Sequence, residues 1–299
     1  MRTVRTVADL RAVLAPERRA GRTIGLVPTM GALHEGHLSL IRAARAASDV
    51  VVVSLFVNPA QFDDDADLAA YPRTEEQDAA AAAAAGADLL FAPPADEVYP
   101  EGFATTVAVG GPLTDTLEGA HRGAAHFHGV TTVVTKLLNM VQPDTAFFGR
   151  KDAQQAVVIG RLVRDLDLPV RIALCPTVRE PDGLALSSRN AHLTGDERER
   201  ALALSRALRE VAAAIAGGTL FDGDAVRAAG LAALRDHGAQ PEYFEVVDPA
   251  TLAPAARLDR DLLLVTAARV GRVRLIDNLP VAPMSQILDV DAEVATLRA

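Results

Sequence analysis

A pair of histidines lies where a strand-like segment passes into a helix-like one. The strand-like segment ends at Pro28-Thr29-Met30-Gly31, and His34-Glu35-Gly36-His37 follows it. Because side chains three residues apart share one face of a helix, both histidines are expected on one face of the first turn. The N-terminus of a helix offers unbonded N–H groups and a partial positive charge, and Gly31 and Gly36 let the backbone come close to a ligand. The pattern predicts a phosphate site, with histidine donors aimed at the charge that develops as a phosphoryl bond breaks.

Two other interpretations of this pair stay open. One histidine could cap the helix while the other lies at the surface. The pair could also bind a metal, although no acidic or cysteine cluster of suitable spacing accompanies it. We therefore assign no residue of the chain as a metal ligand.

A glutamine follows the next strand-like segment. The sequence there is Asn58-Pro59-Ala60-Gln61-Phe62, directly after the β-branched run at residues 50–57. The side-chain amide of Gln61 could fix a carboxylate or a hydroxyl group of a ligand. Taken alone, it could equally be an ordinary loop residue.

Lysine is rare in this chain. Lys136 and Lys151 are the only lysines, and every other fixed cation is an arginine. Lysine supplies a compact point charge that can be steered. Lys151 lies in Phe148-Gly149-Arg150-Lys151-Asp152-Ala153-Gln154-Gln155, where a glycine turn before a helix predicts an anion site, with a solvated turn as the alternative. The phosphate-loop pattern GxxxxGK[ST] occurs nowhere, and Lys136 is expected to extend along the face of a helix.

Two weaker candidates complete the set of polar segments. Leu186-Ser187-Ser188-Arg189-Asn190 offers two hydroxyl groups and a guanidinium that could clamp a triphosphate, although serines before a turn are common. His126-Phe127-His128 is predicted to lie in a glycine-bounded loop, where it could line a site or be exposed. The remaining histidines, His121, His192 and His237, are expected at the surface.

The elements that must position these segments alternate along the first half of the chain. Strands are predicted at 23–29, 50–57, 87–91, 145–148 and 170–174, and helices at 38–47, 74–85, 130–140 and 153–166. Alternation of this kind predicts an α/β fold with a Rossmann-like, doubly wound parallel sheet. Ligands of such sheets collect at the carboxyl ends of the strands, which the histidine, glutamine and lysine segments all follow.

The pattern changes after Cys175. Helices are predicted at 197–216 and 225–237, and strands at 243–247, 262–268 and 273–276, which together indicate a smaller α+β C-terminal domain. The predicted organisation is therefore a Rossmann-like domain at 1–175, a second domain at 176–283 and a tail at 284–299.

Bulk composition narrows the class of protein. The formal net charge of −9 over 299 residues argues against a general nucleic-acid-binding surface, although a phosphorylated ligand needs only local positive charge. The single cysteine, Cys175, excludes an internal disulfide and fits a reducing compartment. No targeting segment is visible, and the strongest apolar stretch, residues 50–57, is too short to cross a bilayer. We expect a cytoplasmic protein with neither nucleic-acid nor membrane partners.

Taken together and in this order, the polar segments resemble those of the pantothenate synthetase (pantoate–β-alanine ligase) family. The resemblance runs from residue 23 to about residue 280 and is strongest at 27–37, 56–62, 71–74, 141–144, 151–155 and 186–190. The histidine motif alone is shared by the wider HIGH-motif superfamily of class I aminoacyl-tRNA synthetases and nucleotidylyltransferases. The combination with the two glutamine segments is far more specific.

The resemblance implies an ATP-dependent condensation of (R)-pantoate with β-alanine to pantothenate, AMP and diphosphate, through a pantoyl-adenylate. It also implies a Mg²⁺ requirement, a homodimer and a C-terminal domain that acts as a lid. By position it implies that His34, His37 and Lys151 are catalytic, that Gln61 and Gln155 bind pantoate, and that Gln61 also borders the β-alanine site. The implied ATP-binding residues are Met30, Gly31, Ala32, Leu33, His34, Glu35, Gly36, His37, Gly149, Arg150, Lys151, Asp152, Val178, Leu186, Ser187, Ser188 and Arg189.

Three positions depart from the family pattern, and two other functions remain to be separated. Ala60 stands where threonine is usual, Arg150 where glutamate or glutamine is expected, and His128 where arginine is common. A nucleotidylyltransferase acting on a phosphorylated substrate would need a second phosphate site in place of the two glutamines. A nucleotide-binding regulator without chemistry should have lost groups such as His37 or Lys151, which this chain retains.

Overall fold

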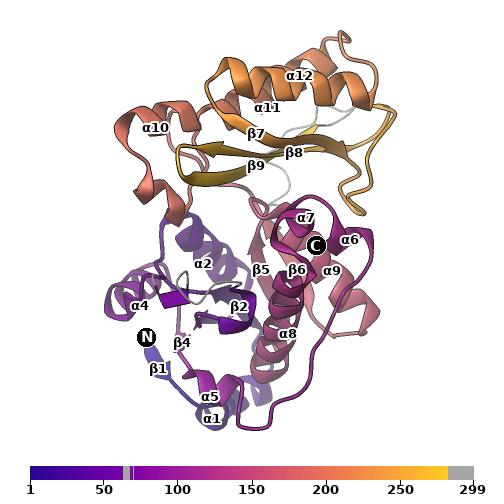
Figure 1. Cartoon of the computed structure of the whole chain (residues 1–299). Helices are drawn as coiled ribbons and strands as arrows, with labels where there is room; N and C mark the ends of the chain where they lie inside the picture. The colour runs from indigo at the N-terminus through magenta and orange to yellow at the C-terminus, as the bar shows by residue number, and fades with distance from the viewer. Residues whose placement is uncertain (63–67, 70, 282–299) are drawn as a thin grey trace. The chain divides into compact units, whose positions relative to one another are not determined.

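The computed structural model describes residues 1–62, 68–69 and 71–281 (Figure 1). By internal packing the chain divides into two compact units. Among the described residues, one comprises Met1–Gly149 and Gln154–Pro176, and the other comprises Arg150–Ala153 and the part that begins at Thr177. The predicted domain boundaries at residues 175 and 283 stay predictions, and the predicted tail at 284–299 lies outside the described residues.

The first unit is built on a six-stranded sheet in which every neighbouring pair is parallel. Its order is β1-β4-β3-β2-β5-β6, so the chain leaves β2 first to one side and later to the other. The point where the strand order reverses therefore lies at β2, between β3 and β5, and this is where open α/β sheets bind ligands. The strands are β1 (Arg2–Val4), β2 (Ile24–Thr29), β3 (Val50–Leu55), β4 (Leu89–Phe91), β5 (Thr145–Gly149) and β6 (Arg171–Cys175).

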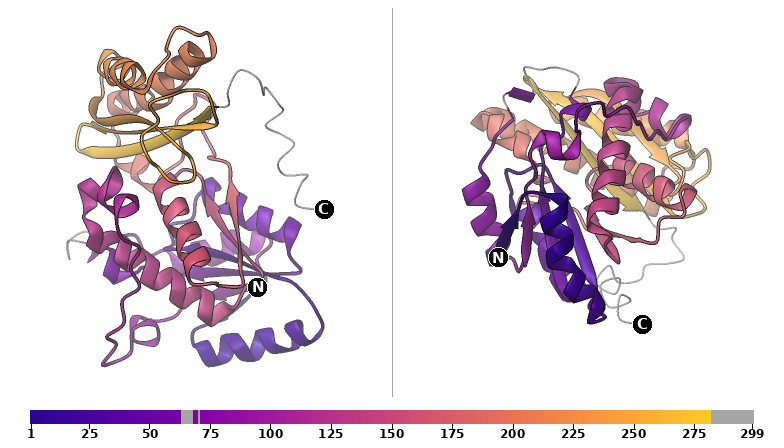
Figure 2. Two further views of the ribbon diagram at one scale, coloured as in Figure 1. Left: turned by 90° about the vertical axis from the view of Figure 1, so that its right-hand side faces the viewer. Right: turned by 90° about the horizontal axis from the view of Figure 1, so that it is seen from below.

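Helices cover both faces of this sheet (Figure 2). On one face α1 (Val7–Arg19), α8 (Ala124–Val141) and α9 (Ala153–Asp165) bury their apolar sides. On the other face α2 (Glu35–Ala47) and α4 (Glu75–Ala84) do the same. The short elements between them are η1 (Pro59–Gln61), α5 (Ala95–Val98), α6 (Pro112–Asp115) and α7 (Glu118–Arg122).

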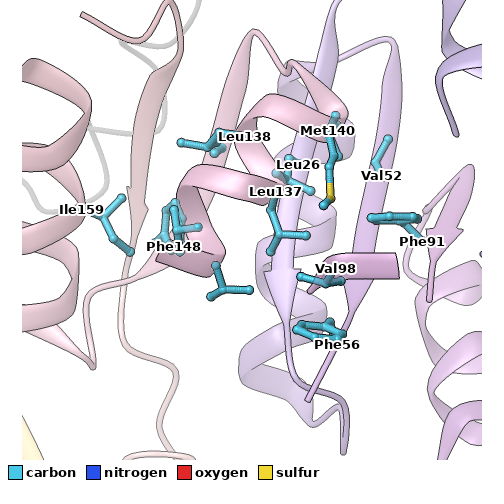
Figure 3. Close-up of a cluster of buried hydrophobic side chains, with 14 of the residues drawn as sticks. Leu26, Val52, Phe56, Phe91, Val98, Leu137, Leu138, Met140, Phe148 and Ile159 are labelled. Atoms are coloured by element: carbon cyan, nitrogen blue, oxygen red, sulfur yellow. The ribbon is translucent and has the colours of Figure 1, made fainter. Parts of the chain in front are cut away.

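The β-branched run shows why β3 lies in the middle of the sheet. Val50 and Val52 enter the core on the α8 side, and Val51 and Val53 enter the core on the α2 side. Successive side chains of a strand point to opposite faces, so a continuous apolar run is stable only where both faces are covered. Figure 3 shows the α8 side of this core, where Leu137 and Met140 lie against Leu26 and Val52. The predicted α/β class with a doubly wound parallel sheet is confirmed.

The second unit contains a three-stranded antiparallel sheet in the order β7-β8-β9. Helices α11 and α12 share one apolar core with these strands. The strands are β7 (Gln240–Val247), β8 (Leu262–Val270) and β9 (Val273–Val281), and the helices are η2 (Ser188–His192), α10 (Gly195–Ala201), α11 (Ala203–Ala216) and α12 (Gly223–Asp236). The predicted α+β class of the smaller C-terminal part is therefore confirmed.

One predicted helix of this unit is wrong in extent. The sequence predicts a single helix over 197–216, whereas the structure ends α10 at Ala201 and begins α11 at Ala203. At the break, the Leu202 N–H donates to the Glu199 carbonyl at 3.3 Å, a tighter i−3 bond. Leu202 is buried and belongs to the apolar core, so the break lies in the packed part of this unit.

Candidate active site

The predicted histidine motif lies at the carboxyl end of β2, at the start of α2. His34 is the N-cap of α2, and its Nδ1 accepts a hydrogen bond from the Gly36 N–H at 3.1 Å. The Nδ1 of His37 accepts from the His34 N–H at 3.4 Å, which completes a reciprocal capping arrangement. The two rings lie 4.2 Å apart between centroids. One histidine therefore does cap the helix, as the alternative interpretation had it, and the cap holds the second ring beside the first.

These bonds fix which nitrogen of each ring carries the proton. A backbone N–H can only donate, so Nδ1 of His34 and of His37 must be the unprotonated nitrogen. In the neutral imidazole the proton is then on Nε2 of both rings. The capping geometry thus puts two neighbouring imidazole N–H groups at the end of β2, and donors of this kind can stabilise charge that develops on a phosphate.

A buried carboxylate holds the turn that leads into this motif. Asp78 of α4 is only 3% exposed, and it accepts hydrogen bonds from the N–H groups of Ala32 at 3.0 Å and Leu33 at 2.7 Å. Thr74 Oγ1 donates to the same carboxylate at 3.1 Å. Ala32 has a φ of 51°, a conformation that costs a non-glycine residue free energy, so its amide needs a firm partner.

The sequence predicts only a helix at 74–85 and gives Asp78 no role, so sequence reasoning missed this residue. The only available signal was one of three acidic residues in the first turn of α4, directly before the alanine run, and such residues are usually solvated. Of the other predicted ATP contacts in this motif, Glu35 is exposed and its carboxylate pairs with Arg42 at the helix surface. Met30 and Leu33 are half-buried.

Gln61 is held at the carboxyl end of the neighbouring strand, β3. Its Nε2 lies 2.9 Å from the sulfur of Met30, and its Oε1 accepts from Asn58 Nδ2 at 3.1 Å. The structure therefore brings the predicted glutamine and the histidine motif together, because Met30 belongs to that motif. The contact follows from the parallel pairing of β2 with β3, which puts both strand ends at one edge of the sheet.

Asn58 is the centre of the network around Gln61. It is 1% exposed, and its Nδ2 also donates to the Gly129 carbonyl at 3.1 Å. Its Oδ1 accepts from the Tyr99 hydroxyl at 2.7 Å and from the Ala60 N–H at 3.3 Å. Every donor and acceptor of the buried amide is thus used, which fixes both its orientation and the loop that carries Gln61.

Helix α8 passes very close to this loop. A Cβ atom placed on Gly129 would lie 2.1 Å from the Ala60 carbonyl oxygen, which no side chain could occupy. Glycine is therefore required at residue 129 for α8 to approach η1.

The predicted loop at 126–128 is wrong, because these residues form the first turn of α8. His126 lies against the site there, with Nδ1 2.9 Å from the Gln61 carbonyl oxygen, and since that oxygen only accepts, Nδ1 carries the proton.

The phenol of Tyr99 gives the network a pH dependence that can be measured. Burial raises the pKa of Tyr99 to about 12, from an ordinary value of 10.0, because the phenolate is poorly solvated there. The folded state therefore keeps a proton that the unfolded state loses above pH 10.0. The stability that this group contributes is complete below that pH and is lost as the pH rises towards about 12.

We expect Tyr99→Phe to remove this component. The difference between the free energies of unfolding of the wild type and the variant should be constant at neutral and mildly alkaline pH. Above pH 10.0 the free energy of unfolding of the wild type should fall relative to that of the variant. Urea unfolding followed across this range measures it, and absorbance titration should show the last of the tyrosinate steps missing in Tyr99→Phe. A difference that stays constant throughout would contradict the burial of this phenol.

The two lysines have different surroundings. Lys136 in α8 stands over the ring of Phe103, with Nζ 4.5 Å from its centroid, and lies 5.9 Å from that of Tyr99. The prediction that Lys136 extends from the face of a helix is confirmed, and its ammonium group makes a cation–π contact there. Lys151 lies in the segment that packs with the second unit, has a side chain 17% exposed, and has Nζ 3.8 Å from an Asp152 carboxylate oxygen.

Of the two adjacent glutamines at the start of α9, one is structural. Gln154 is 5% exposed, donates to the carbonyls of Leu113 and Thr116 at 2.8 and 2.9 Å, and accepts from the Glu118 N–H at 2.8 Å. Gln155 is half-buried and, one residue further along the helix, points in another direction. The family resemblance assigns only Gln155 to a ligand, and that assignment stays a prediction.

Two further predicted ATP contacts, Val178 and Leu186, belong to the second unit and face each other across a short hairpin. The Leu186 N–H donates to the Val178 carbonyl at 3.0 Å, and Arg179 bridges to Ala185. At the tip, Arg198 of α10 donates to Asp182 at 2.6 Å and also pairs with Glu180. The hydrogen bond from Arg198 holds the pKa of Asp182 below its usual value.

The serine-arginine segment follows this hairpin directly. Ser187 caps η2, since its Oγ accepts from the Arg189 N–H at 3.3 Å. Ser188 is half-buried and Arg189 is exposed. The structure thus divides the predicted ATP contacts into two groups, one in each unit, and gives each group its own internal bonds.

Within residues 1–62, 68–69 and 71–281, no group of three or more histidine, cysteine or acidic side chains is arranged to hold a metal ion. Nor does any helix of that part combine the length and the apolar character needed to cross a membrane.

Comparison with known proteins gives one consistent set of relatives. The family model described as pantoate-beta-alanine ligase matches residues 2–280. A pantothenate synthetase of Chelativorans sp. (strain BNC1) is 54% identical over 284 residues, covering 93% of this chain and 97% of that protein. A pantothenate synthetase of Cereibacter sphaeroides is 54% identical over 278 residues, covering 93% of this chain and 99% of that protein.

Solved structures agree with the sequence relatives. The pantothenate synthetase of Thermus thermophilus superposes with a TM-score of 0.88 at 48% identity, covering 95% of this chain and all of that one. The pantoate-beta-alanine ligase of Francisella tularensis, in complex with beta-gamma ATP and β-alanine, gives a TM-score of 0.76 at 34% identity and covers 93% and 97% of the two chains.

Proposed function

Since the chain belongs to the pantoate–β-alanine ligase family, we propose that it condenses (R)-pantoate with β-alanine in two steps that share one ATP. In the first step the pantoate carboxylate attacks the α-phosphorus of ATP, which forms pantoyl-adenylate and releases pyrophosphate. In the second the amine of β-alanine attacks the acyl carbon, which forms pantothenate and releases AMP. The observation that carries this assignment is the contact of Gln61 with the histidine motif through Met30.

The histidine motif has the donors that the first step requires. His34 and His37 carry their protons on Nε2, because the helix N-terminus occupies Nδ1 of each ring. We assign both donors to the phosphate oxygens of ATP, with His37 stabilising the charge that develops as the α–β phosphate bond breaks. The backbone from Met30 to His37 binds the nucleotide at the turn that Asp78 holds.

Pantoate requires groups that bind a hydroxy acid without adding charge. Gln61 and Gln155 both offer a neutral amide that donates and accepts, and we assign them to pantoate, with Gln61 also bordering β-alanine. The bond from Asn58 to Gln61 Oε1 orients that amide before any ligand arrives. Such preorganisation reduces the entropy cost of binding.

Charge is the main obstacle to the first step, because a carboxylate must approach a polyphosphate. Lys151 and Arg189 supply positive charge, and we assign both to the ATP phosphates. We assign the rest of segments 149–152 and 186–189 to ATP as well, and Val178 to its adenine. Mg²⁺ favours substrate phosphates over all-protein cages, so we infer that it binds together with ATP and offsets the phosphate charge.

The order of the two steps can be tested directly. With ATP and pantoate present, pyrophosphate should appear without β-alanine, whereas AMP should be released only after β-alanine is added. Strict dependence of pyrophosphate release on both substrates would overturn the two-step order. A nucleotidylyltransferase would release pyrophosphate only with a phosphorylated acceptor, and a regulator without chemistry would release none.

We further propose that the protein works as a homodimer in the cytoplasm. The family resemblance supports the dimer. The single buried Cys175 and the family's place in small-molecule biosynthesis support the compartment. Sedimentation equilibrium of the purified chain measures the first, and a purely monomeric result would contradict it.

A further inference from the structure

An asparagine of the last described strand holds the backbone beside Lys151. Asn278 lies in β9 and is 4% exposed. Its Nδ2 donates to the Arg150 carbonyl at 2.8 Å and to the Lys151 carbonyl at 2.9 Å. Carbonyl oxygens only accept, so the orientation of this amide is fixed and both of its hydrogens are used. Two consecutive peptide groups are thereby tied to one side chain.

Asn278 is itself held by a buried ion pair. Its N–H donates to Asp277 Oδ1 at 2.8 Å, and its carbonyl accepts from Arg179 Nη2 at 3.2 Å. Arg179 also binds both carboxylate oxygens of Asp277, at 2.6 and 2.9 Å. The Asp277 side chain is 3% exposed, and a charge buried this deeply is tolerated only with such a partner.

The same arginine reaches into the hairpin that carries Val178 and Leu186. Arg179 Nη1 donates to the Gly183 carbonyl at 3.1 Å, inside the turn of that hairpin. A single polar network of Arg179, Asp277 and Asn278 therefore bonds to the hairpin at one end and to the Arg150–Lys151 backbone at the other. All of these residues belong to the second unit.

We propose that Asn278 is a positioning residue for Lys151, and that the Arg179–Asp277 pair is its anchor. This rests on the proposed function, in which Lys151 meets the ATP phosphates. An ammonium group can offset developing charge only if its backbone is correctly placed, and a misplacement of about 1 Å can cost on the order of 100-fold in rate. Asn278 fixes the backbone of Lys151 by binding the carbonyls of Arg150 and Lys151. It thereby sets the position of Lys151 relative to the hairpin assigned to the adenine.

A double-mutant cycle between Asn278 and Lys151 tests the proposal. Asn278→Leu removes both donors at similar volume, and Lys151→Met removes the ammonium. We expect Asn278→Leu to slow pantoate-dependent pyrophosphate release about tenfold or more in the wild-type background, and less than about twofold when Lys151→Met is already present. Equal losses in the two backgrounds would overturn the proposal, since a merely structural role acts in both.

Matched variants guard against a general loss of folding. Asn139→Leu removes an amide-to-carbonyl bond of the same 2.8 Å length from α8 and should leave the rate unchanged. Asn278→Asp keeps the shape of the side chain but faces two carbonyl oxygens with a carboxylate, so it should be at least as slow as Asn278→Leu. It serves in the cycle if the leucine variant does not fold.

Hydrogen–deuterium exchange provides a measurement that does not depend on catalysis. Peptides covering 149–155 should exchange faster in Asn278→Leu than in the wild type, whereas peptides covering 34–40 should be unchanged. If the wild type released no pyrophosphate with pantoate, the proposed function would fail, and exchange would still decide whether Asn278 holds the segment. Unchanged exchange at 149–155 would overturn the inference whatever the activity.

Discussion

Replacing His37 with alanine is expected to slow pantoate-dependent pyrophosphate release by about 100- to 1000-fold, a loss of roughly 2.7 to 4 kcal/mol of transition-state stabilisation. The reason lies in the capping geometry. His37 Nδ1 accepts from the His34 N–H, so the proton that His37 offers to a ligand is on Nε2. That proton is lost in the variant at the moment when the leaving pyrophosphate gains charge. Rapid-quench measurement of the first turnover isolates this step from product release.

Two conservative replacements distinguish the donor from the cap. Glutamine extends an amide N–H to about the place of Nε2, so His37→Gln should recover part of the rate. Asparagine reaches only about as far as Nδ1, so His37→Asn should keep the cap of α2 and remain slow. A loss of less than about tenfold in His37→Ala would exclude His37 from the phosphate role.

Replacing Lys151 with alanine is expected to cost on the order of 100-fold or more in the same step, because a carboxylate must attack a polyphosphate. The measurement is the rate of pyrophosphate release at saturating pantoate. Adenylate formation should suffer far more than the second step, in which a neutral amine attacks. Aminolysis of preformed pantoyl-adenylate provides that comparison.

Arginine is the informative control at this position. Lys151→Arg keeps the positive charge but replaces a compact ammonium by a planar fork, so we expect partial activity. Activity equal to wild type would mean that only net charge matters there. If Lys151→Ala lost less than about tenfold, the lysine would have no role at the phosphates, and the positioning role of Asn278 would fall with it.

Much of the fold follows from local patterns in the sequence. The run Val50–Val53 could satisfy both faces only as an inner strand, and the alternation around it requires a parallel sheet. Patterns were weaker at the margins, where β1 and α1 were not predicted and α8 was predicted to begin at residue 130 rather than at Ala124. The polar first turn of α8, with His126 and His128, hid its helical character.

The candidate site divides in the same way. His34, Gln61 and Lys151 could be found in the sequence because each follows a strand end with an adjacent glycine or proline. Asp78 and Asn278 could not, since neither is near those segments in the chain. Asp78 bonds to Ala32 and Leu33 from α4, and Asn278 bonds to Arg150 and Lys151 from β9.

The sequence by itself determined the chemistry of this protein: the types of reactive side chain, their order, and their places at strand ends. These are local properties, because periodicity and turn chemistry act over a few residues. Only the tertiary structure decided which distant groups orient them, namely Asp78 for the histidine turn and Asn278 for Lys151. The reason is that a buried polar side chain takes its partners from whatever backbone packing brings to it, and that backbone is remote in the chain.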